Sequence, residues 1–146
     1  MHGCEVGGKR LGVIGLGRTG AGVGLAAAGL GMQVHGWSRS LTVNRAAELG
    51  IEFHSDVDSL FATCTHITVH CAHTPETHHL VDARRLGLMP GVAADGTECG
   101  NHLLNLARGG IVDEAAACAA LADGTLATCV LDVLEIEPVD PGHPIL

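Results

Sequence analysis

One arginine stands out as a residue that could bind a substrate. Arg108 lies in the stretch NLARGGIVDE, residues 105–114, between an apolar run and an Ala-rich segment. If residues 102–106 form a strand of a parallel sheet, Arg108 follows its carboxyl end, the edge at which open α/β sheets bind ligands. A guanidinium presents a planar fork of donors that suits a carboxylate, so a small organic acid is the first substrate class to consider. The alternative is a solvated loop arginine at a helix start.

A second candidate site is the glycine-rich segment GLGRTG, residues 15–20, which follows an apolar run and opens a helical pattern. Gly15 permits a tight turn, Gly17 lets the backbone approach a pyrophosphate, and Gly20 allows close contact between helix and strand. The amino end of a helix adds amide donors and positive potential. The pattern indicates a dinucleotide site, and the alternative is a glycine-rich turn that binds no nucleotide.

The segment WSRS, residues 37–40, bears on which dinucleotide binds. A carboxylate at this place accepts a hydrogen bond from the ribose 2′-hydroxyl of NAD, whereas an arginine can contact the 2′-phosphate of NADP. Here Ser38 and Arg39 occupy the position and no carboxylate does. We therefore predict NADP over NAD. The alternative is that Arg39 is solvated and the site accepts either cofactor.

The composition limits the class of protein. A chain of 146 residues is the size of one domain with a single core. It is 47% hydrophobic, with 21 glycines, two phenylalanines and no tyrosine, which favours an aliphatic α/β interior. The net charge of −8 argues against a nucleic-acid partner. Residues 1–8 lack the features of a signal peptide and no run reaches the ~18 apolar residues of a membrane span, so we predict a cytoplasmic protein without membrane contact.

Ten histidines and six cysteines raise the question of a metal site. The candidate ligands are Cys64, His66, His70, Cys71, His73, Cys99 and His102. No two chelating pairs occur at zinc-finger separation, and no Cys-x-x-Cys pair occurs. We therefore predict no metal and expect the cysteines to be reduced core residues.

The order of elements predicts a single Rossmann-type domain over residues 1–146, with a doubly wound parallel sheet. The expected strands are residues 11–14, 32–37, 51–53, 67–70, 102–106 and 126–133. Helices are expected over residues 21–30, over 43–49 after Thr42, from Ser55 or Asp56 through Phe61, and over 113–122 before Gly124. Gly22 and Gly24 lower helix propensity, so close packing should hold the first helix. Residues 92–102 are expected to contain an inserted surface loop.

Four motifs occur along the chain in one order: LGVIGLGR at 11–18, VHCAHTPET at 69–77, NLARGGIVDE at 105–114 and LDVLEIEP at 131–138. Together they resemble the NAD(P)-binding domain of the D-isomer-specific 2-hydroxyacid dehydrogenases. Residues 37–42, WSRSLT, are most similar to the glyoxylate or hydroxypyruvate reductase type. The resemblance implies hydride transfer between NAD(P)H and a small 2-keto or 2-hydroxy acid.

The resemblance also implies roles for single residues. Arg108 would hold the substrate carboxylate and keto oxygen, and Glu137 would keep a histidine acid/base protonated. The cofactor contacts that it implies are Arg18 and Thr19 at the pyrophosphate, Ser38 at the ribose, and Cys71, Ala107 and Asp132 on the nicotinamide side. The family's histidine lies in a downstream Pro-His segment that this chain does not reach, and His143 is the alternative.

The family's substrate domain is built from segments before and after the one found here. We therefore expect the isolated chain to bind a dinucleotide with little turnover, and to form a homodimer or to associate with the missing segments. The alternative is a non-catalytic dinucleotide-binding module or remnant that acts as a sensor or interaction protein. Two departures from the family pattern are Met89, which precedes Pro90-Gly91 where a lysine is usual, and Leu106, where a small polar residue is common.

Overall fold

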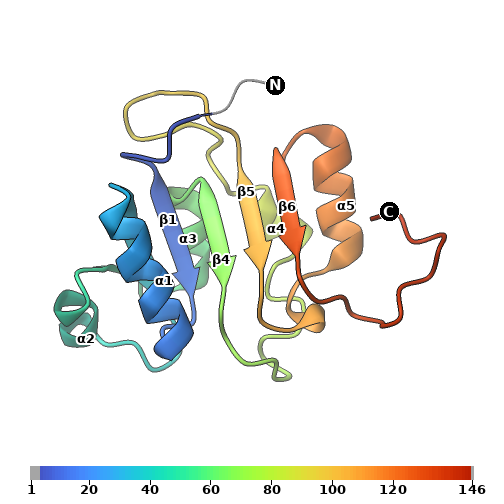
Figure 1. Cartoon of the computed structure of the whole chain (residues 1–146), viewed down its shortest axis with the longest axis horizontal. Helices are drawn as coiled ribbons and strands as arrows, with labels where there is room; N and C mark the ends of the chain where they lie inside the picture. Colours follow the sequence, from blue (N-terminus) through green and yellow to red (C-terminus); the bar gives the residue numbers. More distant parts are fainter. Residues whose placement is uncertain (1–3, 146) are drawn as a thin grey trace.

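A parallel sheet forms the centre of the computed structural model, which describes residues 4–145 (Figure 1). The described residues form six strands in the order β3-β2-β1-β4-β5-β6, and every neighbouring pair is parallel. The strands are β1 (Arg10–Ile14), β2 (Gln33–Trp37), β3 (Glu52–Phe53), β4 (His66–Val69), β5 (His102–Asn105) and β6 (Thr128–Leu131). The chain winds outward in both directions from β1 and β4, so the predicted doubly wound Rossmann sheet is confirmed.

The helices lie on both faces of this sheet (Figure 1). They are α1 (Arg18–Gly29), α2 (Val43–Glu48), α3 (Val57–Thr63), α4 (Ala83–Leu86) and α5 (Glu114–Asp123), with a short 3-10 helix η1 (Gly109–Ile111). In Figure 1, α1 crosses in front of the sheet and α3 lies behind it. Right-handed crossovers produce this division because the two halves of the sheet are wound in opposite directions from the centre.

Local capping residues bound three of the helices where the sequence predicts them. The Thr42 hydroxyl accepts a hydrogen bond from the Arg45 amide at 3.1 Å and begins α2. For α3 the two candidates are resolved in favour of Asp56, whose carboxylate accepts from the Ser59 amide at 2.8 Å. Helix α5 ends at Gly124, whose φ of 85° lies in the left-handed region that glycine tolerates.

Two boundaries differ from the prediction. Helix α1 begins at Arg18 and not at Ala21, because Gly17 is already its extended N-cap. Within α1, a β-carbon at Gly24 would lie 3.3 Å from Val34, whereas one at Gly22 would meet nothing within 4 Å. Close packing therefore accounts for Gly24 and not for Gly22. Strand β6 is shorter than residues 126–133, because Leu126 is buried in the core before the ladder begins.

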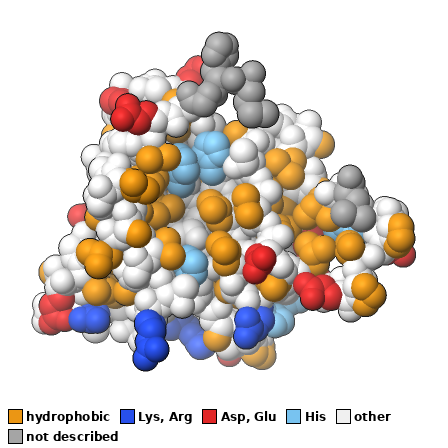
Figure 2. Space-filling model, in the orientation of Figure 1, with side chains coloured by type: hydrophobic (Ala, Val, Ile, Leu, Met, Phe, Trp, Pro, Cys, Tyr) orange, Lys and Arg blue, Asp and Glu red, His pale blue; other side chains and the backbone are white. Residues whose placement is uncertain are grey.

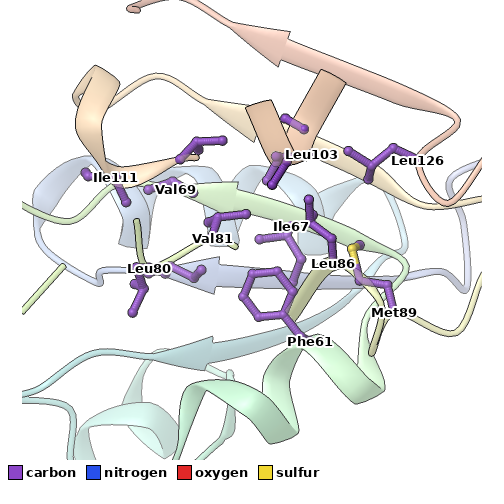
Figure 3. Close-up of a cluster of buried hydrophobic side chains, with 14 of the residues drawn as sticks. Phe61, Ile67, Val69, Leu80, Val81, Leu86, Met89, Leu103, Ile111 and Leu126 are labelled. Carbon is purple, nitrogen blue, oxygen red and sulfur yellow. The ribbon is translucent and has the colours of Figure 1, made fainter. Parts of the chain in front are cut away.

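The larger hydrophobic core lies on the face that carries α3 and α5 (Figure 3). Phe61 of α3 is fully buried against the aliphatic residues of the central strands, among them Ile67 and Leu103. A smaller cluster on the opposite face joins α1 to β1 and β2 through Ala27, Val13 and Val34. These two cores fix the strands, and so they fix the carboxyl edge at which the strands end.

The expected inserted loop lies at the amino edge of the sheet, at the top of Figure 1. It is closed at its base, where the amides of Cys99 and Gly100 both donate to the Gly91 carbonyl at 3.1 and 2.9 Å. Ala93 is buried, and the Lys9 ammonium lies 3.8 Å from the Asp95 carboxylate. The insertion is therefore folded and lies away from the carboxyl edge.

The described residues, 4–145, contain no helix that is both long and apolar enough to cross a membrane. Residues 1–3, part of the segment in which we looked for a signal peptide, lie outside the described residues.

Candidate active site

Two adjoining clefts run along the carboxyl edge of the sheet. The β2 cleft, of about 320 Å³, is lined by Gly15, Leu16, Gly17, Trp37, Ser38, Arg39, Ser40, His70, Cys71, Ala72 and Thr77. The β5 cleft, of about 610 Å³, is lined by Thr19, His70, Cys71, Ala72, His73, Leu106, Ala107 and Arg108. Because both share residues 70–72, they form one groove from Arg39 to Arg108. Figure 2 shows basic side chains, drawn in blue, along this lower edge.

The glycine turn between β1 and α1 forms one wall of the groove. Gly15 has a φ of 90°, and a β-carbon there would lie 2.6 Å from the Cys71 amide nitrogen. A β-carbon at Gly20 would collide with the Gly15 carbonyl. Gly17 is exposed and extended, and no described side chain caps α1. The first amides of α1 are therefore open to an anion at the groove.

The end of β2 carries the predicted ribose contacts. Ser38 is half-buried and lines the β2 cleft together with the exposed Arg39. The Arg39 side chain is 60% exposed, and its Nη1 lies 3.5 Å from Oε2 of Glu76 in the loop after β4. Glu76 was not among the site residues predicted from the sequence.

The floor shared by the two clefts is uncharged. Burial lowers the pKa of His70, whose Nε2 lies 2.8 Å from the Thr68 hydroxyl. Burial raises the pKa of the half-buried Cys71 thiol. Both side chains are therefore neutral near pH 7, and the floor presents polar but uncharged atoms to a bound molecule.

Arg108 lies at the far end of the groove, in the turn after β5. It is exposed, and its Nη1 donates to the Ala107 carbonyl at 2.7 Å. The fully buried Asn105 holds this turn: its amide donates to the Arg108 carbonyl at 2.9 Å and its carbonyl accepts from the Ala107 amide at 3.1 Å. No role was predicted for Asn105 from the sequence. A polar residue at the end of an apolar strand is the signal that could have identified it.

Glu137 makes its side-chain hydrogen bond within its own loop and not with Arg108. Glu137 is exposed, lines neither the β2 cleft nor the β5 cleft, and accepts from the Leu134 amide at 3.0 Å. His143, the alternative acid/base, lies with its Nε2 3.0 Å from the carboxylate of Glu114. Asp132 follows β6 and its amide donates to the Asn105 carbonyl at 3.0 Å, so its backbone lies beside the turn that carries Arg108.

The metal candidates have other partners. His66 and His102 stack with ring centroids 4.4 Å apart, and His102 Nε2 lies 2.9 Å from the Cys99 carbonyl. Burial raises the pKa of the Cys64 thiol to about 12, so it is neutral. Within residues 4–145, no three His, Cys, Asp or Glu side chains come together as a metal site.

The chain that forms this groove is similar to a known protein family over its whole length. All residues from 1 to 146 match the model of the D-isomer specific 2-hydroxyacid dehydrogenase NAD binding domain. The chain belongs to this family. A glyoxylate reductase of Aeropyrum pernix is 37% identical over 145 residues, which cover 99% of this chain and 41% of the relative. A D-3-phosphoglycerate dehydrogenase of Mycobacterium tuberculosis is 41% identical over 139 residues, which cover 94% of the chain and 24% of the relative.

Solved structures agree with the family assignment. The D-isomer specific 2-hydroxyacid dehydrogenase from Xanthobacter autotrophicus Py2, in complex with NADPH and MES, matches with a TM-score of 0.83 at 35% identity. The match covers 99% of this chain and 43% of that one. This chain thus corresponds to the NAD-binding domain and spans well under half of the relatives' length.

Proposed function

We propose that the groove binds NADP(H) or NAD(H) for an oxidoreductase that transfers hydride between the nicotinamide and a small 2-keto or 2-hydroxy acid. The observation that carries this proposal is the single groove that joins the open amino end of α1 to Arg108 across an uncharged floor. A groove at the point where strand order reverses is the place where doubly wound sheets bind dinucleotides. The NADPH complex of the Xanthobacter relative supports the choice of cofactor.

The groove suggests how the dinucleotide lies. The pyrophosphate would contact the first amides of α1, beside Arg18 and Thr19. The adenosine ribose would lie in the β2 cleft beside Ser38 and Arg39. Because no carboxylate occupies the end of β2, we favour NADP over NAD. The nicotinamide would lie at the opposite end of the groove. Its contacts would be Cys71, Ala107 and Asp132.

In this arrangement Arg108 would hold the acid. Its guanidinium can grip a carboxylate and a keto oxygen together, and so present the carbonyl carbon to the nicotinamide. Hydride transfer to that carbon also needs a proton for the oxygen, and the proposed role of Glu137 is to keep a histidine protonated for this step. Glu137 accepts from the Leu134 amide here and contacts no histidine among the described residues. We therefore propose that residues 1–146 bind dinucleotide but turn over little acid without further segments.

Titration of the chain with NADPH and NADH tests the proposal. We expect saturable binding of both, tighter for NADPH, and little NADPH oxidation with glyoxylate or hydroxypyruvate. Arg108→Ala should leave dinucleotide affinity within about twofold, while in a protein extended by the flanking segments it should raise the KM for the acid more than about tenfold. Equal losses for cofactor and acid would assign Arg108 to the dinucleotide or to the fold.

A second candidate is a non-catalytic dinucleotide-binding module. The hydrogen bond of Glu137 to the Leu134 amide, and not to a histidine, favours it, since a sensor needs the groove but no acid/base pair. Rapid turnover by the chain alone would exclude this candidate. Self-association is a further proposal, supported by exposed Leu25 on α1, Leu30 at the C-cap of α1 and Val130 on β6. Sedimentation at increasing concentration tests it. A cytoplasmic location is likewise a proposal, which imaging of tagged protein would test.

A further inference from the structure

We propose that Glu76 is a specificity-determining residue, which limits how well the groove accepts the 2′-phosphate of NADP(H). This inference rests on the proposed function, because it requires the adenosine ribose to lie in the β2 cleft. It goes beyond that function by assigning a role to a residue that lies outside the glycine turn and outside the end of β2.

Glu76 lies beside the β2 cleft, in the loop that follows β4. Its Oε2 lies 3.5 Å from Nη1 of Arg39, which follows β2. Arg39 and Thr77, the neighbour of Glu76, both line the β2 cleft. The pair therefore lies beside the cleft, and in the proposed pose a 2′-phosphate that contacts Arg39 would lie near this carboxylate.

The loop that carries Glu76 is held in place by its own hydrogen bonds. The buried Thr77 hydroxyl donates to the Ala72 carbonyl at 2.7 Å and accepts from the Thr74 amide at 2.7 Å. The Thr77 amide donates to the Thr74 carbonyl at 3.0 Å. The backbone at Glu76 is thus fixed against the groove, which keeps its charge near Arg39.

The two charges act in opposite directions on the two cofactors. With NAD, the ribose 2′-hydroxyl can donate to a carboxylate, and Glu76 supplies the carboxylate that the end of β2 lacks. With NADP, the 2′-phosphate is repelled by Glu76 and must draw Arg39 away from it. The side chains of Arg39 and Glu76 are 60% and 65% exposed, so solvent screens both effects and the discrimination is moderate.

The test is the Glu76→Gln variant of residues 1–146, with dissociation constants for NADPH and NADH measured by calorimetry at low salt. We expect NADPH affinity to rise about three- to tenfold, while NADH affinity stays equal or falls. At high salt this gain should shrink, because the charges are exposed. Glu48→Gln is the matched control: it removes the same charge from a pair with Arg45 at 2.8 Å on α2, and Glu48 lines neither the β2 cleft nor the β5 cleft.

A double variant separates this proposal from general electrostatics. In an Arg39→Gln background, Glu76→Gln should raise NADPH affinity less than it does in the wild type, because no arginine remains to be released. An unchanged NADPH-to-NADH ratio in Glu76→Gln, or the same shift in Glu48→Gln, would overturn the role of Glu76 and leave the proposed function standing. A folded wild type that binds neither dinucleotide would overturn both.

Discussion

The two ends of the groove differ in how completely this chain builds them. At the cofactor end, the glycine turn, the start of α1 and the end of β2 surround the β2 cleft, and each position is fixed by backbone contacts. At the other end, Arg108 is exposed and bonds to the neighbouring Ala107 carbonyl, while Glu137 bonds to Leu134. Backbone atoms thus form most of the cofactor end. The Arg108 end depends on side chains, and these bond to backbone atoms of the loops that carry them.

The cofactor half of the site is self-contained, and the substrate half is not. Backbone amides and glycine turns are oriented by the sheet itself, so the cofactor end forms wherever the domain folds. A substrate site built from charged side chains needs partners that hold those side chains in place. In this chain only the turn under Arg108 is held, by the buried Asn105.

The largest expected effect would come from breaking the cofactor end at Gly20. In Gly20→Val, the new side chain would collide with the Gly15 carbonyl and force α1 away from β1. We expect dinucleotide affinity to fall more than about 100-fold, together with a loss of about 2–4 kcal/mol in the free energy of unfolding. Calorimetry and urea unfolding measure the two quantities.

The control for this change lies two residues further along α1. Gly22 faces open space, so Gly22→Ala should raise the free energy of unfolding by about 0.5–1 kcal/mol and leave dinucleotide affinity unchanged. Wild-type affinity in Gly20→Val would mean that the groove does not need the close contact of α1 with β1.

A smaller effect is expected at the other end, from Asn105→Ala. This change leaves the Ala107 amide and the Arg108 carbonyl without their buried partner, at a cost of about 1–3 kcal/mol in the free energy of unfolding. Because the proposed ribose and pyrophosphate contacts lie outside this turn and only nicotinamide contacts adjoin it, NADPH affinity should change less than about threefold. Exposed Asn44 on α2 provides the control, since Asn44→Ala should change neither quantity. A large loss of NADPH affinity in Asn105→Ala would show that the two ends are coupled.

Local chemistry explains what the sequence could predict. The caps at Thr42 and Asp56, the left-handed Gly124 and the glycine turn each depend on one residue and its immediate neighbours. The strand order follows from the alternation of strands and helices, because right-handed crossovers leave few alternatives. For these reasons most of the fold and the cofactor end could be predicted.

Partner choice between distant side chains could not be predicted in the same way. The pairing of Arg39 with Glu76 depends on where the loop after β4 reaches the end of β2. The pairing of His143 with Glu114 depends on how residues 132–145, which form no helix or strand, return to α5. A carboxylate in such a segment bonds to whichever donor the loop places beside it, as Glu137 does with Leu134.

The smallest expected effect is on the pH dependence of the free energy of unfolding. It tests whether the two halves of the sheet unfold together. Burial, with the neighbouring His54, lowers the pKa of His35 on β2 to about 4, and burial, with His102, lowers that of His66 on β4 to about 4. The unfolded chain, with a histidine pKa near 6.5, then binds more protons than the folded chain as pH falls below 6.5. Stability is therefore full above pH 6.5 and is lost progressively as pH falls toward 4.

Urea unfolding between pH 7.5 and 4.5 measures this loss. Because both rings are only half-buried, we expect His35→Gln or His66→Gln to remove about 1 kcal/mol each of the pH-dependent change, whereas exposed His78→Gln should leave it unaltered. If the sheet unfolds as one unit, either variant shifts the whole transition equally, and the difference between the two ends of the groove belongs to the site alone. Two separate transitions, each sensitive to one histidine, would instead assign that difference to the stability of the two halves.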